Sequence, residues 1–193
     1  MTRSQILDAA EAIFPTRGYH QASVEEIAEQ AGLSTGAVYS NFDGKADLCL
    51  ALYERHCARQ AQELEEVVAR GATPEAQIEE ASGHLLGVLR RDAQWLLLDM
   101  EFLAYAARHP ELRARYAEVH AVMRDAVVHL IERATASFDL SLPAEPQALA
   151  VMMNALSMGF MFEKIADPDR VPDDALETAL ALVVRPRSQA PAP

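Results

Sequence analysis

The stretch SVEEIAEQAGLSTGAVYSNF, residues 23–42, contains the signals for two short helices joined by a tight turn. Ser23 and Glu26 form the Ser-x-x-Glu pattern of a capping box, which starts a helix. Gly32 stands where a left-handed C-cap would end that helix, and Ser34 can cap the next one. Two short helices joined by a turn that contains glycine predict a helix-turn-helix.

A first helix is expected before this stretch, over about residues 3–14, because apolar residues recur there at the spacing of one helix face. Pro15 cannot donate a helical hydrogen bond, so this helix should kink or tighten before Gly18 ends it. A long helix over about residues 45–70 should follow the helix-turn-helix, since no Pro or Gly interrupts it. These helices would make a small N-terminal head on a long connecting helix.

The rest of the chain predicts further helices and no strand. Thr73 can cap a helix with Pro74 at its first position, and Asp92 is expected to cap a separate sixth helix. The other expected ranges are about 35–41, 93–108, 110–137 and 147–166, with a ninth helix starting at Pro172. We therefore predict an all-α fold of about nine helices. The predicted divisions are a helix-turn-helix domain over residues 1–48, a second domain over 49–186 and a flexible tail over 187–193.

The charge of the chain argues against nucleic-acid binding at first sight. The formal net charge is −12, and residues 1–55 carry four Lys or Arg against eight Asp or Glu. A nucleic-acid binder usually has a basic domain or patch. However, the segment 34–40 contains no acid. We therefore expect few phosphate contacts and weak affinity, rather than no binding.

Composition also bounds the location and the cysteine chemistry. We expect a cytoplasmic protein without a membrane partner, because no export signal and no apolar stretch long enough to span a bilayer are apparent. Cys49 and Cys57 are two helical turns apart, about 12 Å, so they cannot form a disulfide with each other. Ordinary packing is the favoured interpretation of both, with an intersubunit thiol switch as the alternative.

Residues 3–55 resemble the DNA-binding region of the TetR family of transcriptional repressors. The resemblance rests on several features at fixed spacing: Phe14, Arg17-Gly18-Tyr19, Ile27-Ala28, Ala31-Gly32, Gly36, Tyr39, Phe42, Lys45 and Leu48. Pro15 departs from the family, which more often has a helix former there, and Asn41 stands where histidine is common. The resemblance implies double-stranded DNA as a partner, with the third helix in the major groove.

This resemblance places the DNA contacts on and around the third helix. Thr35 can bond a base edge, Gly36 lets the backbone approach closely, and Tyr39 can reach a phosphate or a base. Lys45, in the first turn of the fourth helix, is the strongest single candidate for a phosphate contact. The predicted DNA-binding residues are Arg3, Ser34, Thr35, Gly36, Tyr39, Ser40, Asn41 and Lys45.

Beyond the head, the resemblance implies a helical effector-binding domain that forms a homodimer. A mostly apolar site with a few polar groups suits a small molecule, and Met-rich walls adapt to varied ligands. The predicted effector-binding residues are Trp95, Glu101, Phe102, Tyr105, Met123, Met153, Asn154 and Ser157. For Glu101, pairing with an arginine such as Arg124 is an equally good alternative. The predicted dimer interface comprises Leu149, Met152, Leu156, Phe160, Leu176, Leu180 and Val183.

The predicted function is a repressor that leaves a palindromic operator when a small, mostly apolar effector binds. The alternative is a helical ligand-binding or scaffold dimer that has lost DNA binding. We expect no enzyme, metal or cofactor, because the sequence has no Glu-x-x-His pair, His-Glu-x-x-His, Gly-x-Ser-x-Gly or P-loop.

Overall fold

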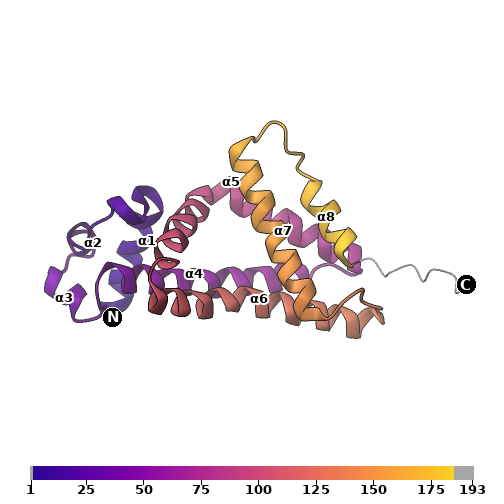
Figure 1. Cartoon of the computed structure of the whole chain (residues 1–193), viewed down its shortest axis with the longest axis horizontal. Coiled ribbons are helices and arrows are strands. Elements are labelled where there is room, and N and C mark those ends of the chain that lie inside the picture. The colour runs from indigo at the N-terminus through magenta and orange to yellow at the C-terminus, as the bar shows by residue number, and fades with distance from the viewer. Residues whose placement is uncertain (1, 185–193) are drawn as a thin grey trace, which may run out of the picture. The chain divides into compact units, whose positions relative to one another are not determined.

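The computed structural model describes residues 2–184, and of Asp92 only the backbone. Every regular element in this part of the chain is a helix, which confirms the all-α prediction (Figure 1). The eight helices are α1 Thr2–Gln21, α2 Val24–Gln30, α3 Thr35–Tyr39, α4 Lys45–Val68, α5 Pro74–Ala106, α6 Pro110–Phe138, α7 Pro146–Ala166 and α8 Ala175–Val184. The predicted tail over 187–193 lies outside the described residues.

Three helix boundaries differ from the prediction. The last described helix begins at Ala175 rather than at Pro172. Helix α1 runs through Pro15 and is interrupted at Gly18, whose φ of 76° and ψ of 163° are not helical. Helix α5 continues through Asp92, so the separate sixth helix was wrong. No Gly or Pro follows Gly87 until after α5 ends, and a capping residue alone does not stop a helix among good helix formers. With α1 counted as two segments, the described helical segments number nine.

The helix-turn-helix signals are confirmed in detail. Ser23 and Glu26 form both bonds of the capping box. Gly32 has a left-handed φ of 67°, and the Leu33 amide donates to the Ala28 carbonyl at 2.9 Å, which closes the end of α2. Ser34 caps α3. Local sequence therefore determines the turn between α2 and α3.

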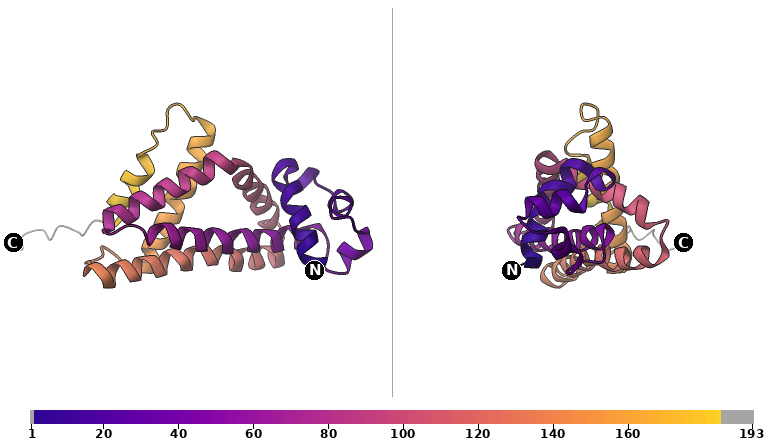
Figure 2. Two further views of the ribbon diagram at one scale, coloured as in Figure 1. Left: turned by 180° about the vertical axis from the view of Figure 1, so that it is seen from behind. Right: turned by 90° about the vertical axis from the view of Figure 1, so that its left-hand side faces the viewer.

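The chain forms two compact units. The first contains residues up to 59 together with 92–121, and the second contains 60–91 together with the described residues from 122 onward. In the first unit α1 packs against α2 and α3, and α2 packs against α3, as the views in Figure 2 also show. Its interior includes the fully buried side chains of Ile6, Phe14, Ile27, Val38, Leu48 and Phe102. The predicted functional boundary between residues 48 and 49 stays a prediction, and this unit extends beyond it.

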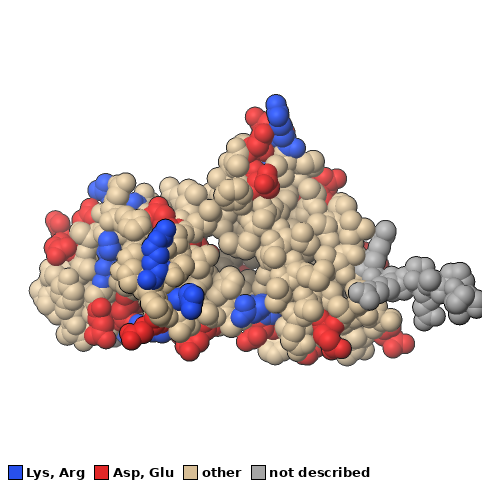
Figure 3. Space-filling model, viewed as in Figure 1, with Lys and Arg blue, Asp and Glu red and all other residues tan. Residues whose placement is uncertain are grey.

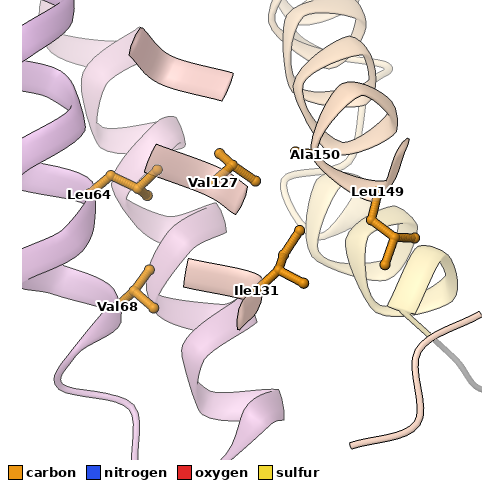
Figure 4. Close-up of a cluster of buried hydrophobic side chains, with 6 residues drawn as sticks. All are labelled: Leu64, Val68, Val127, Ile131, Leu149 and Ala150. Carbon is orange, nitrogen blue, oxygen red and sulfur yellow. The ribbon is translucent and has the colours of Figure 1, made fainter. Parts of the chain in front are cut away.

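A hydrophobic cluster from three helices forms the core of the second unit (Figure 4). Helices α4, α6 and α7 each contribute two side chains, namely Leu64, Val68, Val127, Ile131, Leu149 and Ala150. Helix α8 packs against α7. Because α4, α5 and α6 run through both units, each of these helices has a segment in either core.

Helix α7 is the one described helix whose length and composition suffice to cross a membrane, so the expectation that no such stretch exists was wrong. Its most apolar window has a mean hydropathy of 1.3, and 17% of that window is buried. One helix of this kind is weak evidence for a membrane span. Buried Leu149, Ala150 and Met161 share α7 with exposed Val151, Met152, Leu156 and Phe162.

Candidate nucleic-acid interface

Helix α3 is held by its own polar side chains and by one buried residue. Ser34 Oγ accepts from the Ala37 amide at 3.2 Å, while Ser40 Oγ and Asn41 Nδ2 donate to the Ala37 carbonyl at 2.9 and 2.8 Å. Val38 is buried and fixes the helix against the head. These local bonds satisfy both ends of a helix too short to be stable alone.

The opposite face of α3 is exposed. Tyr39 is 54% exposed, Gly36 and Ser40 are also exposed, and Thr35 is half-buried. A Cβ built on Gly36 would meet only Ser34 Oγ, at 3.8 Å, so packing within the protein does not require glycine there. The structure therefore brings four of the predicted DNA-binding residues together on one outward face.

Arg3 lies close to this helix-turn-helix through Phe42. Its guanidinium carbon is 4.9 Å from the centre of the Phe42 ring, and the side chain is exposed. Arg17, by contrast, pairs with Glu26 at 3.2 Å and so contributes to the α1–α2 contact. Arg3 remains a candidate for DNA contact.

Lys45 has protein partners that the sequence did not reveal. Its Nζ donates to the carbonyls of His20 and Ala22 at 3.2 and 3.1 Å. It also lies 4.8 Å from the centre of the Tyr19 ring. The ammonium that was predicted to face a phosphate is thus turned toward the end of α1.

Tyr19 is also contacted by the C-terminal part of α5. Glu101 Oε2 accepts from the Tyr19 amide at 2.8 Å. This amide is available because the break at Gly18 interrupts the helical hydrogen-bond pattern. The Tyr19 ring lies 5.1 Å from Phe102 and 4.8 Å from Tyr105. Three residues predicted to bind an effector therefore contact the DNA-binding head. The Arg124 considered as a partner of Glu101 belongs to the other unit.

A buried polar network was missed by the sequence analysis. Tyr116 Oη donates to Asp99 Oδ1 at 2.6 Å, and Tyr53 Oη lies 3.3 Å from Tyr116 Oη and 3.2 Å from His120 Nδ1. Burial raises the pKa of Asp99, and hydrogen bonds from the two tyrosines oppose that rise. The acid inside the apolar run LLLDMEF was the available signal, whereas its tyrosine partners come from other helices.

Trp95, another predicted effector residue, lies in the core. Its ring stacks on His56 with 3.9 Å between ring centres and 11° between planes. Burial, together with the charge of Arg59, lowers the pKa of His56 to about 4. The imidazole is therefore neutral near pH 7 and serves as a packing surface for Trp95.

The other four predicted effector residues belong to the second unit. Met123 and Met153 pack against its hydrophobic cluster, and Ser157 Oγ donates to the Met153 carbonyl at 2.9 Å. Asn154 Nδ2 is buried with no hydrogen-bond partner among the described residues. The eight predicted residues thus divide evenly between the two units, and neither unit alone assembles them into one site.

Part of the predicted dimer interface was wrong. Leu149, Leu176 and Leu180 are at most 2% exposed, so they fill the core of the second unit and cannot contact a partner. Met152 and Leu156 are exposed, whereas Phe160 and Val183 are half-buried. Among the exposed large apolar residues of α7 and α8, the sequence analysis missed Val151, Phe162 and Leu182. Figure 3 shows a broad uncharged area over the second unit, and α7 itself carries only two charged residues.

Among residues 2–184, no group of three or more His, Cys, Asp or Glu side chains is placed to hold a metal ion. The arrangement that stands out instead is an acid-free, outward-facing α3 in a compact helix-turn-helix. In DNA-binding proteins the second helix of this motif enters the major groove. Fold and site together define the class of helix-turn-helix DNA-binding proteins.

Comparison with known proteins supports that class. Residues 6–52 match the family model for bacterial regulatory proteins of the TetR family, and residues 74–185 match the C-terminal model of BetI-type transcriptional repressors. The chain therefore belongs to the TetR family of bacterial regulatory proteins. The family consists of regulators rather than enzymes.

The individual proteins that resemble this chain are also named as transcriptional regulators. The transcriptional repressor AcnR of Corynebacterium diphtheriae is 33% identical over 133 residues, which span 69% of this chain and 65% of that protein. The transcriptional activator FasR of Mycolicibacterium smegmatis is 28% identical over 68% of this chain and 59% of its own length. The chain thus spans about three fifths of these relatives. FadR of Bacillus subtilis, solved in complex with stearoyl-CoA, has the same fold at a TM-score of 0.73 and 22% identity, covering 94% of this chain and 97% of FadR.

Proposed function

We propose that this protein represses transcription from a palindromic operator as a cytoplasmic homodimer, and that a small, mostly apolar effector releases it. The observation that carries the proposal is the outward face of α3. This face offers two hydroxyls, a phenol and an open glycine, and it carries no acid. Thr35 and Tyr39 are the candidates for base contacts, with Gly36 giving the backbone access to the groove.

Phosphate contacts are assigned to the residues around α3. Ser34, Ser40 and Asn41 have polar side chains near the ends of the helix, and Arg3 supplies a positive charge beside Phe42. Polar side chains of this kind position a protein on DNA without specifying sequence. With so few cations in each head, tight binding requires two heads at once.

The exposed apolar side of α7 supports the homodimer. Val151, Met152, Leu156 and Phe162 are between 37% and 52% exposed on one helix, and Leu182 on α8 is 56% exposed. Large apolar side chains exposed in this number on one helix are typical of a protein interface. If two copies pair through α7 and α8 around a two-fold axis, their α3 helices would read two half-sites related by the same symmetry.

An acyl compound is the first effector to test. The solved FadR of Bacillus subtilis contains stearoyl-CoA. In the second unit here, Met123 and Met153 pack against the hydrophobic cluster, and the buried Asn154 Nδ2 has no hydrogen-bond partner among the described residues. Flexible Met side chains adapt to long apolar ligands, and a single amide could bind one ligand oxygen. This effector class is a proposal for the present chain.

The central test is binding of the purified protein to the DNA upstream of its own gene. We expect a specific complex at 50 mM salt that weakens as salt rises, because phosphate contacts release counterions. Substitution of Tyr39 by Ala should weaken specific binding, and substitution of the exposed Gln62 on α4 should not. Absence of any complex with wild-type protein at low salt would favour the alternative, a helical dimer that no longer binds DNA.

The effector test uses the same complex. Stearoyl-CoA is expected to weaken operator binding, and operator DNA must then weaken stearoyl-CoA binding by the same factor, since the coupling is reciprocal. Free CoA is the matched control for the nucleotide part of the molecule. An unchanged complex with both compounds would exclude acyl-CoA as the effector without affecting the proposal of DNA binding.

A further inference from the structure

Lys45 occupies a position where its own helix does not favour a cation. It is the first residue of α4, and the N-terminal end of a helix dipole is positive. A lysine there needs a compensating partner. A DNA phosphate is one solution, and the structure shows another within the protein.

The compensating partner is the C-terminal end of α1. Helix α1 ends at Gln21, and Lys45 Nζ donates to the carbonyls of His20 and Ala22 at 3.2 and 3.1 Å. Because α1 is interrupted at Gly18, these carbonyls belong to the single turn that follows the break, and the last carbonyls of a helical turn lack partners in the helix itself. Lys45 therefore caps α1 from another helix, and two of its three N–H donors are used in doing so.

The Tyr19 ring adds to this arrangement. Nζ lies 4.8 Å from the ring centre, a cation–π distance, and Tyr19 is only 3% exposed. Tyr19 is itself fixed by Glu101, which accepts its amide hydrogen at 2.8 Å. The ammonium thus lies against a rigid, buried partner rather than on a mobile surface.

The position of α3 depends on this contact. Only the short segment 40–44 separates α3 from Lys45, so the first turn of α4 determines where α3 ends. Holding Lys45 against His20 and Ala22 fixes α4 to the junction that leads from α1 into α2. The helix-turn-helix is then fixed at both of its ends.

We propose that Lys45 is a positioning residue of the DNA-binding head: its ammonium closes the end of α1 onto α4 and supports operator binding through the placement of α3, without a phosphate contact. This inference rests on the proposed operator binding. It differs from the role that the sequence alone assigned to Lys45.

The experiment compares stability and salt dependence in the same variants. Lys45→Met should lower the Tm of the DNA-free protein by about 5 °C, because hydrogen bonds from a charged group are lost. It should weaken operator binding by about tenfold at every salt concentration, and the slope of log K against log salt should equal that of wild type. A lost phosphate contact would instead reduce that slope by about 0.9 per head.

Arg3→Met is the matched control, since Arg3 is an exposed cation of the same head. It should reduce the salt slope while leaving the Tm nearly unchanged. Lys45→Gln covers the case in which Lys45→Met does not fold, because its amide can still donate to a carbonyl. Its salt slope should also equal that of wild type.

A reduced salt slope in either Lys45 variant, or a wild-type Tm in Lys45→Met, would overturn the proposal. Failure of the proposed function is distinguishable, because wild type would then form no complex at 50 mM salt. The Tm comparison between Lys45→Met and Arg3→Met would still report whether Lys45 caps α1.

Discussion

At the scale of single residues, Gly18 shows how one backbone conformation arranges several contacts. Its φ of 76° and ψ of 163° belong to a region that is essentially restricted to glycine. The break there frees the Tyr19 amide for Glu101, and it precedes the turn whose carbonyls bind Lys45. A Cβ at this position would approach the Glu101 carboxylate oxygens to 2.7 and 2.8 Å.

Gly18→Ala should therefore lower the free energy of unfolding by about 2–3 kcal/mol, from backbone strain and from a displaced Glu101. Denaturant unfolding measures this change. Gly83→Ala is the matched control, because Gly83 lies within α5 and a Cβ there meets nothing within 4 Å. The control should be neutral or stabilise by about 0.5–1 kcal/mol, and equal effects of the two substitutions would contradict the proposed strain.

The stability of the folded protein depends on pH through His56. Its pKa is lowered from 6.5 to about 4 in the folded state, so between these values the unfolded chain binds a proton that the folded chain does not. The contribution of His56 to stability is therefore complete above pH 6.5 and is lost as the pH falls toward 4. His56→Phe, which keeps an aromatic ring on Trp95, should lose less stability between pH 7 and pH 5. Identical pH profiles of urea unfolding for both proteins would refute this.

At the scale of helices, α5 supplies the residues that hold the head. Its segment 92–106 belongs to the same compact unit as α1–α3, and Glu101, Phe102 and Tyr105 all contact Tyr19. Arg115 on α6 adds an ion pair to Asp47 on α4, with 2.6 Å between Nη2 and Oδ1. A movement of α5 or α6 would therefore be transmitted to the DNA-binding head through these contacts.

Glu101→Ala should lower the free energy of unfolding by about 1–3 kcal/mol, because the Tyr19 amide loses its acceptor. Glu101→Gln retains an acceptor oxygen and should recover most of the loss. Thermal unfolding of both variants provides the measurement. If Gln destabilises as much as Ala, the carboxylate charge rather than the hydrogen bond holds Tyr19.

At the scale of the whole molecule, the main consequence of the fold is the apolar side of α7. Helix α7 buries Leu149, Ala150 and Met161 and leaves Met152 and Leu156 at the surface. Unlike the exposed residues of α7, Cys49 and Cys57 are both buried. Burial raises the pKa values of both thiols, that of Cys57 to about 12. Packing therefore accounts for both cysteines, and neither has the low pKa of a reactive thiol.

Leu156→Glu should convert the proposed homodimer to a monomer, because a charge would be buried in the apolar contact. Light scattering after size-exclusion chromatography measures the mass. Met100→Glu is the matched control, because Met100 and Leu156 are both 37% exposed and Met100 lies on α5. The proposed interface on α7 is wrong if Leu156→Glu keeps the wild-type mass, or if both variants lose it.

The sequence by itself determined the features that depend on neighbours along the chain. The capping box at Ser23, the left-handed Gly32 and the cap at Ser34 were all predicted, because each involves residues within a few positions of one another. The all-α fold followed from the same local signals. The candidate face of α3 also followed, since the four residues that define it lie within six positions of one another.

Only the tertiary structure decided which side chains from distant segments meet. Lys45 and His20 are 25 positions apart, and Glu101 and Tyr19 are 82 positions apart, so no spacing rule could pair them. The same reason explains why Leu149 was expected at a dimer interface: a periodic apolar pattern shows that a residue is buried, but not which surface buries it. Local preference determines helices and their ends, whereas packing between helices determines the partners of their side chains.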